Sequence, residues 1–208
     1  METQQIAQDD PHALNLAVEL LLAGEVISFP TDTVYGIGVR ADSQAAIEKL
    51  YQIKARSFDK PIPVMVATVG QLKQVASIVP ANARQLAARF WPGPLTIVLP
   101  KRADLPDNLT SLPGVGIRIP DHPFVLNLLK HCGPLAVTSA NLSGQAEALC
   151  AKSVIAQLGG RLALIVDGGD SPGGIASTVV DLTGEQPRIL RVGPIDAEMI
   201  TRALADLA

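Results

Sequence analysis

The stretch VISFPTDTVYGIG, residues 26–38, decides the fold class of this chain. Residues 26–29 are typical of a buried strand, and the small, polar residues that follow predict a loop outside the core. A helix is then predicted over residues 42–56, because Ile47 and Leu50 fall on one apolar face. A strand, a loop and a helix in this order are typical of an α/β protein.

The same alternation continues on both sides of this stretch. A first helix is predicted from a cap at Asp10 and Pro11 to a stop at Gly24. Several strands with helices between them predict a single domain over residues 1–208, with a twisted mixed sheet flanked by helices. The other predicted strands are 61–67, 94–100, 116–120, 134–137, 162–166 and 177–182, with helices near 71–77, 81–90 and 196–207 and a tight segment at 187–194.

Composition excludes several classes of protein. The chain has 208 residues, 48% of them hydrophobic and 18% charged, which fits a packed core and excludes disorder, collagen and coiled coil. No apolar run approaches the roughly 18 residues of a membrane span, and the first ten residues lack the pattern of a signal peptide. We therefore expect a soluble, cytoplasmic protein with no membrane partner.

The distribution of charge argues against a dedicated nucleic-acid binder. The net charge is −3, and five of the 20 acidic residues lie in residues 1–30, which leaves 15 acidic against 17 basic residues elsewhere. Any contact with nucleic acid should therefore be local. A built-in metal site is not expected either, because neither the two cysteines nor the three histidines form a metal-binding pattern.

Small polar clusters at strand ends are the candidate sites, since ligands of open α/β sheets bind there. The first is Thr31 with Asp32 and Thr33, which can hold a polar ligand or simply form a turn. The second combines Lys54, Arg56 and Lys60 at a helix end. Cations there are favoured by the helix dipole, but an ammonium beside a guanidinium is also what a polyphosphate requires.

The third cluster is VTSANLSG, residues 137–144, where a capping turn does not easily explain every hydroxyl and amide. Its polar members are Thr138, Ser139, Asn141 and Ser143. Charged residues within apolar strands add to the candidates, because a buried charge needs a partner. These are Arg118 and Arg191, and Ser177 follows a glycine-rich loop.

Missing motifs narrow the chemistry. The sequence has no GxxxxGK[ST], no complete GxGxxG and no GxSxG, which disfavours P-loop NTPases, Rossmann dinucleotide sites and serine hydrolases. The polar clusters are suited to holding anions. They point toward nucleotide chemistry by positioning and charge neutralisation.

In order and spacing, the motifs together resemble the YrdC-like family of threonylcarbamoyl-AMP synthases over about residues 10–195. The motifs are FPTDTVYGIG (29–38), KAR with KP (54–61), WPGPLTIVLP (91–100), GIRIPDHP (116–123), TSANLSG (138–144), STVVDL (177–182) and LRVG (190–193). The resemblance implies an α/β fold with a large concave, positively lined cavity. It also implies a nucleotidyltransferase that makes threonylcarbamoyl-AMP and pyrophosphate from L-threonine, bicarbonate or carbon dioxide, and ATP with its magnesium.

The resemblance further implies partners and roles. The product would pass to a separate transferase complex that modifies tRNA to threonylcarbamoyladenosine. Lys54 and Arg56 match the pair that faces the ATP phosphates and stabilises developing charge. Threonine would contact Thr31, Arg118 and Ser177, and the nucleotide would also contact Lys60, Thr138, Ser139, Asn141, Ser143 and Arg191.

Two other hypotheses stay open at this point. One is a non-catalytic module that binds double-stranded RNA or tRNA, which the bulk charge disfavours. The other is a divergent paralogue with another substrate, which the intact KxR and TSAN segments disfavour. One departure from the family is Ser57, where many relatives have proline after the arginine. The length resembles the short, single-domain branch of the family.

Overall fold

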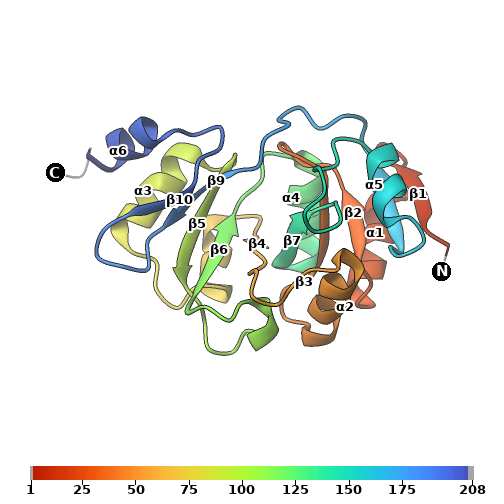
Figure 1. Cartoon of the computed structure of the whole chain (residues 1–208), viewed down its shortest axis with the longest axis horizontal. Coiled ribbons are helices and arrows are strands. Elements are labelled where there is room, and N and C mark those ends of the chain that lie inside the picture. The colour runs from red at the N-terminus through yellow and green to blue at the C-terminus, as the bar shows by residue number, and fades with distance from the viewer. Residues whose placement is uncertain (1, 206–208) are drawn as a thin grey trace.

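Among residues 2–205, which the computed structural model describes, ten strands form one mixed sheet in the order β1-β8-β2-β3-β7-β4-β6-β5-β9-β10 (Figure 1). The predicted fold class, a mixed α/β protein with one large sheet flanked by helices, is confirmed. The strands are β1 (Gln4–Ala7), β2 (Ile27–Phe29), β3 (Gly36–Arg40), β4 (Val64–Met65), β5 (Leu95–Pro100), β6 (Gly114–Arg118), β7 (Leu135–Ser139), β8 (Leu164–Asp167), β9 (Thr178–Asp181) and β10 (Arg188–Arg191). The helices are α1 (Ala13–Leu22), α2 (Gln44–Lys54), α3 (Ala81–Phe90), α4 (Pro123–Cys132), α5 (Ala151–Leu158) and α6 (Ala197–Ala205), with short 3-10 helices η1 (Val69–Gln74) and η2 (Asp107–Leu109).

The two faces of the sheet carry separate apolar clusters. One cluster packs α2, α3, α5 and α6 against the sheet over most of its width. The other packs α1 and α4 against β2, β7 and β8 on the opposite face. Successive residues of β8 illustrate the alternation, because Leu164 and Val166 join the second cluster and Ile165 joins the first.

The opposite face of β5, β6 and β9 lines a cavity instead. In β5, Leu95 and Ile97 enter the first apolar cluster, whereas Thr96 and Val98 line the cavity. The same strands therefore present large apolar side chains on one face and small or polar ones on the other. This alternation places the cavity on the half of the sheet that α1 and α4 do not cover (Figure 1).

The prediction that residues 30–38 form a loop outside the core is correct only in part, because residues 30–35 form neither helix nor strand but do not lie outside the core. β3 begins within this segment, and Thr31, Thr33 and Tyr35 are all buried. Polar side chains can be buried here because hydrogen bonds satisfy them. Thr31 Oγ1, for example, donates to the Val34 carbonyl oxygen at 2.7 Å.

Gly36, at the start of β3, packs closely against the adjacent strand β7. A Cβ at Gly36 would lie 2.9 Å from Cγ1 of Val137 on the adjacent β7. The glycines of this segment therefore do not mark a loop. They let the backbone of β3 approach β7 and the Phe29 ring more closely than a side chain would allow.

Other elements differ from prediction at the edges of the sheet. The strand β1 and the helices α4 and α5 were not expected, and β10 lies within the segment 187–194. The edge strands β1 and β10 carry mostly exposed, polar side chains, so they lack the alternation that reveals a half-buried strand. The helix near 71–77 is the 3-10 helix η1, and residues 206–207 of the predicted last helix lie outside the described residues.

Two smaller predictions concern membranes and cysteines. None of the helices within residues 2–205 combines the length and the hydropathy that spanning a bilayer requires. Cys132 and Cys150 are both free thiols. Cys132 is buried, whereas Cys150 is half-buried at the start of α5.

Candidate functional site

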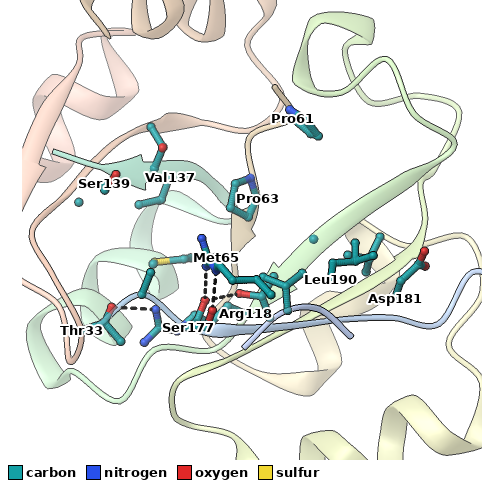
Figure 2. A pocket seen from close by; sticks show the side chains of 18 of the residues that line it. Thr33, Pro61, Pro63, Met65, Arg118, Val137, Ser139, Ser177, Asp181 and Leu190 are labelled. Atoms are coloured by element: carbon teal, nitrogen blue, oxygen red, sulfur yellow. Dashed lines mark hydrogen bonds between the residues drawn. The ribbon is translucent and has the colours of Figure 1, made fainter. Parts of the chain in front are cut away.

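A cavity of about 490 Å³ lies over β4, β6, β5, β9 and β10 and reaches the ends of β2, β3 and β7. Its lining contains Arg56, Arg118 and Arg191 as well as one ion pair, Arg188 with Asp181. Glu147 is a further carboxylate in the lining. The cavity is thus lined with more positive than negative charge, and Figure 2 shows part of this lining.

Arg118 is held from three directions at one end of the cavity. Its Nη2 donates to Asp32 Oδ2 at 2.7 Å, its Nη1 to Thr33 Oγ1 at 3.0 Å and its Nε to the Gly93 carbonyl oxygen at 3.0 Å. Figure 2 shows the contact between Thr33 and Arg118. Thr33 Oγ1 in turn lies 3.0 Å from Thr31 Oγ1. This network fixes the plane of the guanidinium.

Burial changes the properties of Arg118 without removing its charge. The residue is 5% exposed, and burial lowers its pKa, while the neighbouring Asp32 carboxylate opposes that change. Arginine nevertheless stays protonated in proteins, and it carries five N–H donors. Because the three bonds to Asp32, Thr33 and Gly93 use only part of them, Arg118 can still hold a carboxylate from the cavity.

A second group of hydroxyls lies beside Arg191. Ser177 Oγ is 2.8 Å from Thr96 Oγ1, and Arg191 donates from Nη2 to Ser177 Oγ at 3.2 Å and from Nε to the Ser177 carbonyl oxygen at 2.9 Å. These bonds join β5, β9 and β10 across the cavity floor (Figure 2). The charge of Arg191 also acts on Arg118, so the two guanidinium groups face the same region.

Lys54 lies at the end of α2 but points into the segment 138–144. Its ammonium donates to the carbonyl oxygens of Ser139 and Asn141, the latter at 2.6 Å, and the residue is 1% exposed. Burial, with a smaller effect of Arg56, lowers the pKa of Lys54 to about 7. The Lys54 side chain therefore holds the shape of this loop and does not line the cavity.

Asn141 and Ser143 also act inside the loop. Asn141 Nδ2 donates to the carbonyl oxygens of Leu142 and Gln145 at 2.9 and 2.7 Å. The Ser143 backbone N–H donates to the Lys54 carbonyl oxygen at 3.0 Å. The Ser143 bond ties the loop to α2, and Thr138 and Ser139, at the end of β7, are the members of this motif that line the cavity.

Arg56 enters the cavity lining from the segment after α2. Its Nε and Nη2 donate to the carbonyl oxygens of Lys60 and Pro61 at 3.1 and 3.0 Å, which fold the segment 57–61 back over the helix end. Tyr51 supports the same fold, because its hydroxyl donates to the Lys60 carbonyl oxygen at 3.0 Å. Lys60 itself is exposed and lies outside the cavity lining.

Comparison with known proteins shows which family this chain belongs to. A family profile described as "Telomere recombination", the Sua5, YciO and YrdC profile, matches residues 19–193. The chain belongs to this family. The threonylcarbamoyl-AMP synthase of Bacillus subtilis is 40% identical over 208 residues, covering 99% of this chain and 60% of the relative.

Two other members of the Sua5/YciO/YrdC family extend the comparison. The threonylcarbamoyl-AMP synthase of Rattus norvegicus is 42% identical, covering 82% of this chain and 63% of the relative. A crystal structure of Sua5 from Pyrococcus abyssi complexed with L-threonine superimposes with a TM-score of 0.92 at 35% identity, covering 98% of this chain and 61% of that one. The chain thus spans about three fifths of the length of these relatives.

The site residues predicted from the family's motifs fall into two groups. Those that line the cavity are Thr31, Arg56, Arg118, Thr138, Ser139, Ser177 and Arg191. Those that do not are Lys54, Lys60, Asn141 and Ser143, of which all but the exposed Lys60 shape the loop behind it. The role of each residue toward a ligand stays a prediction.

Sequence reasoning missed several residues of this family site. Thr96 and Glu147 line the cavity, and Asp32, though noted as a turn residue, holds Arg118. Thr96 alternates with large apolar residues in β5, which is the signal that could have revealed it. Glu147 had no such signal, but its charge partly opposes the lowering of the pKa values of Lys54 and Arg191 by burial, so it lies near both cations.

A metal site formed by the protein alone was not expected. Within residues 2–205, no three His, Cys, Asp or Glu side chains gather closely enough to hold a metal ion.

Proposed function

We propose that the protein is an L-threonylcarbamoyladenylate synthase, a nucleotidyltransferase that consumes L-threonine, bicarbonate or carbon dioxide, and ATP. One observation carries the proposal. A single cavity joins the buried Arg118 with its hydroxyl partners to Arg56 and the Thr138–Ser139 edge, so that a carboxylate and a polyphosphate can be held together. The names of the relatives and the L-threonine complex of the Pyrococcus abyssi protein support the same reaction.

The Arg118 end suits the amino acid. A guanidinium fixed by Asp32 presents its remaining N–H groups as a planar fork, which matches a carboxylate. Thr31 and Ser177 line the same cavity and carry hydroxyl groups. In this proposal, Arg118 binds the threonine carboxylate, and the two hydroxyl residues bind its other polar groups.

The opposite side of the cavity suits the nucleotide. Arg56 contributes a cation there, and Thr138 and Ser139 contribute hydroxyl and backbone donors. Arg191 contributes a second cation from the Ser177 side, between the two substrates in this proposal. Lys54, Asn141 and Ser143 hold the loop that presents these donors, and Lys60 adds positive charge near the entrance. Arg56 is the proposed catalytic residue, because it can offset charge that develops on the phosphates. Lys54 contributes by adding its charge behind the loop.

The proposed reaction has two steps. The threonine amine first attacks bicarbonate or carbon dioxide, which forms an N–C bond and gives the carbamate with loss of water or a proton. A carbamate oxygen then attacks the α-phosphorus of ATP, and the bond to pyrophosphate breaks. The cavity contributes mainly by bringing the two anionic substrates together and offsetting their charge, since effective concentration and electrostatic stabilisation account for most catalysis of this type.

Magnesium and the partners belong to the same proposal. Magnesium would arrive as part of Mg–ATP, because triphosphate oxygens are ligands that this ion prefers. The product would pass to a separate transferase complex acting on tRNA, in the cytoplasm where ATP and tRNA are available. We also propose that one domain holds the whole site, since strands from one sheet supply most of its lining.

The test is release of pyrophosphate from ATP, magnesium and bicarbonate, with and without L-threonine, together with mass spectrometry of the adenylate. We expect release that depends on threonine and that Arg118→Lys lowers, because lysine keeps the charge but loses the fork. Arg84→Lys is the matched control, since Arg84 is exposed and lies outside the cavity lining. If the protein binds ATP but its release of pyrophosphate does not depend on threonine, the proposal is contradicted, and another substrate or an RNA-binding role is favoured.

A further inference from the structure

Met65 lies next to Arg118 on the face of the sheet that forms the cavity. The strands β4 and β6 are parallel, and Met65 is paired in register with Arg118. Residues paired in this way point to the same face, and neighbouring strands are only about 4.8 Å apart. Both side chains line the cavity, and Figure 2 shows the Met65 thioether beside Arg118, Thr33 and Ser177.

The surroundings of Arg118 are otherwise polar. Asp32 and Thr33 bond to its guanidinium, and Arg191 and Ser177 face the same region. Met65 brings an unbranched, apolar side chain into this group, and the residue as a whole is 8% exposed. An apolar group inside a polar pocket has no hydrogen-bonding role there, so it is suited to contact an apolar part of a ligand.

Val137 is a second apolar residue of the lining, but its methyl groups already pack within the protein. They lie 2.9 and 3.1 Å from the positions that a Cβ atom on Gly36 or Gly38 would take. Val137 therefore packs against the glycines of β3. Met65 is paired in register with Arg118 and has a flexible apolar side chain, so it is well placed to contact a ligand held there.

This inference rests on the proposed function. An amino acid held by its carboxylate on Arg118 carries its side chain only a few bonds away, which is within reach of the neighbouring strand. Threonine differs from serine by one methyl group. We propose that the Met65 thioether packs against this γ-methyl group and is the residue that selects threonine over serine.

The expected size of the effect follows from the chemistry of one methyl group. A methyl in an apolar pocket gives roughly 10- to 200-fold discrimination. Methionine is flexible and adapts to irregular gaps, so the lower part of this range is expected here. The wild-type protein should therefore use L-serine measurably, at roughly a tenth or less of its kcat/KM for L-threonine.

The test compares kcat/KM for L-threonine and L-serine in the wild type and in Met65→Ala, with adenylate products identified by mass spectrometry. The variant should lose most of the preference for threonine, by roughly 10-fold, while the KM for ATP stays unchanged. Met65→Leu should restore the preference, because it returns apolar volume beside Arg118. Val98→Ala is the matched control, since it truncates an apolar lining residue on β5 and should affect both amino acids equally.

The outcomes separate this inference from the proposed function. If Met65→Ala keeps the wild-type preference for threonine, the Met65 inference is wrong and the synthase proposal stands. If the wild type forms no threonine adenylate, both are wrong. Met65 also belongs to an apolar cluster, so Met65→Val serves as a second variant should the alanine protein not fold. It shortens the side chain with a residue that suits a strand.

Discussion

The Asp32 carboxylate and the Arg118 guanidinium form an ion pair with Oδ2 and Nη2 2.7 Å apart, although 86 positions separate them in the chain. Their side chains are 12% and 6% exposed. The pair joins the segment after β2 to the end of β6. The Asp32 carboxylate partly balances the charge of Arg118 and fixes the orientation of its guanidinium in the cavity.

Asp32→Ala is expected to lower the free energy of unfolding by about 3–5 kcal/mol, because it leaves the Arg118 charge buried without its partner. Urea denaturation measures the change. Asp104→Ala is the matched control, since its pair with Arg102 has the same 2.7 Å distance but is exposed. This control should leave stability nearly unchanged. Equal effects of the two substitutions would show that Asp32 and Arg118 behave as a surface pair.

Lys54→Ala is expected to reduce kcat by on the order of 10²-fold, as for other single charge-stabilising groups. The substitution removes a charge behind the phosphate side and leaves the carbonyl oxygens of Ser139 and Asn141 without their donor. Threonine-dependent pyrophosphate release measures the loss. Lys49→Ala is the control, because Lys49 lies on the same helix and pairs with Glu25 at the surface. If Lys54→Ala keeps the kcat of the wild type, Lys54 has no role in the reaction.

The lowered pKa of Lys54 predicts that the stability of the protein depends on pH. The pKa of Lys54 is about 7 in the folded protein and 10.5 in its unperturbed form. Between these values the unfolded chain binds more protons, so the contribution of Lys54 to the free energy of unfolding increases as pH rises. Relative to Lys54→Met, the wild type should become more stable from pH 7 to pH 9 in urea denaturation. A difference that is independent of pH, or that falls, would contradict the lowered pKa.

Thr96→Val tests the hydroxyl group that sequence reasoning missed. The substitution keeps the shape of the side chain but removes the 2.8 Å bond to Ser177 Oγ. A hydrogen bond of this kind contributes about 0.5–1.5 kcal/mol. We therefore expect the free energy of unfolding to fall by about this amount, and the KM for threonine to rise because Ser177 loses a partner that orients its hydroxyl group, with little change in the KM for ATP. If only the KM for ATP increases, Ser177 contacts the nucleotide and not threonine.

Some of the site could be predicted because its signal is local. Arg118 stands between apolar residues in a strand, and that conflict alone predicts a partner or a ligand. The hydroxyl residues at the end of β7 and just beyond it stand out in the same way, since several polar side chains follow the apolar first half of that strand. The motif KAR likewise marks Arg56, which lines the cavity.

Other features could not be predicted from local patterns. The orientation of Lys54 depends on where the carbonyl groups of Ser139 and Asn141 end up after β3 pairs with β7. The partnership of Asp32 with Arg118 depends on the packing of distant segments. Met65 looks like an ordinary core residue in the sequence, and only its register with Arg118 places it in the cavity.

The sequence by itself determined the alternation of strands and helices and the set of polar residues at strand ends, because periodicity and turn chemistry act over a few residues. The tertiary structure decided which half of the sheet stays uncovered and which polar groups face it. That choice depends on strand order and on the packing of α1 and α4 over β2, β7 and β8. These are contacts between residues far apart in the chain, and no local pattern encodes them.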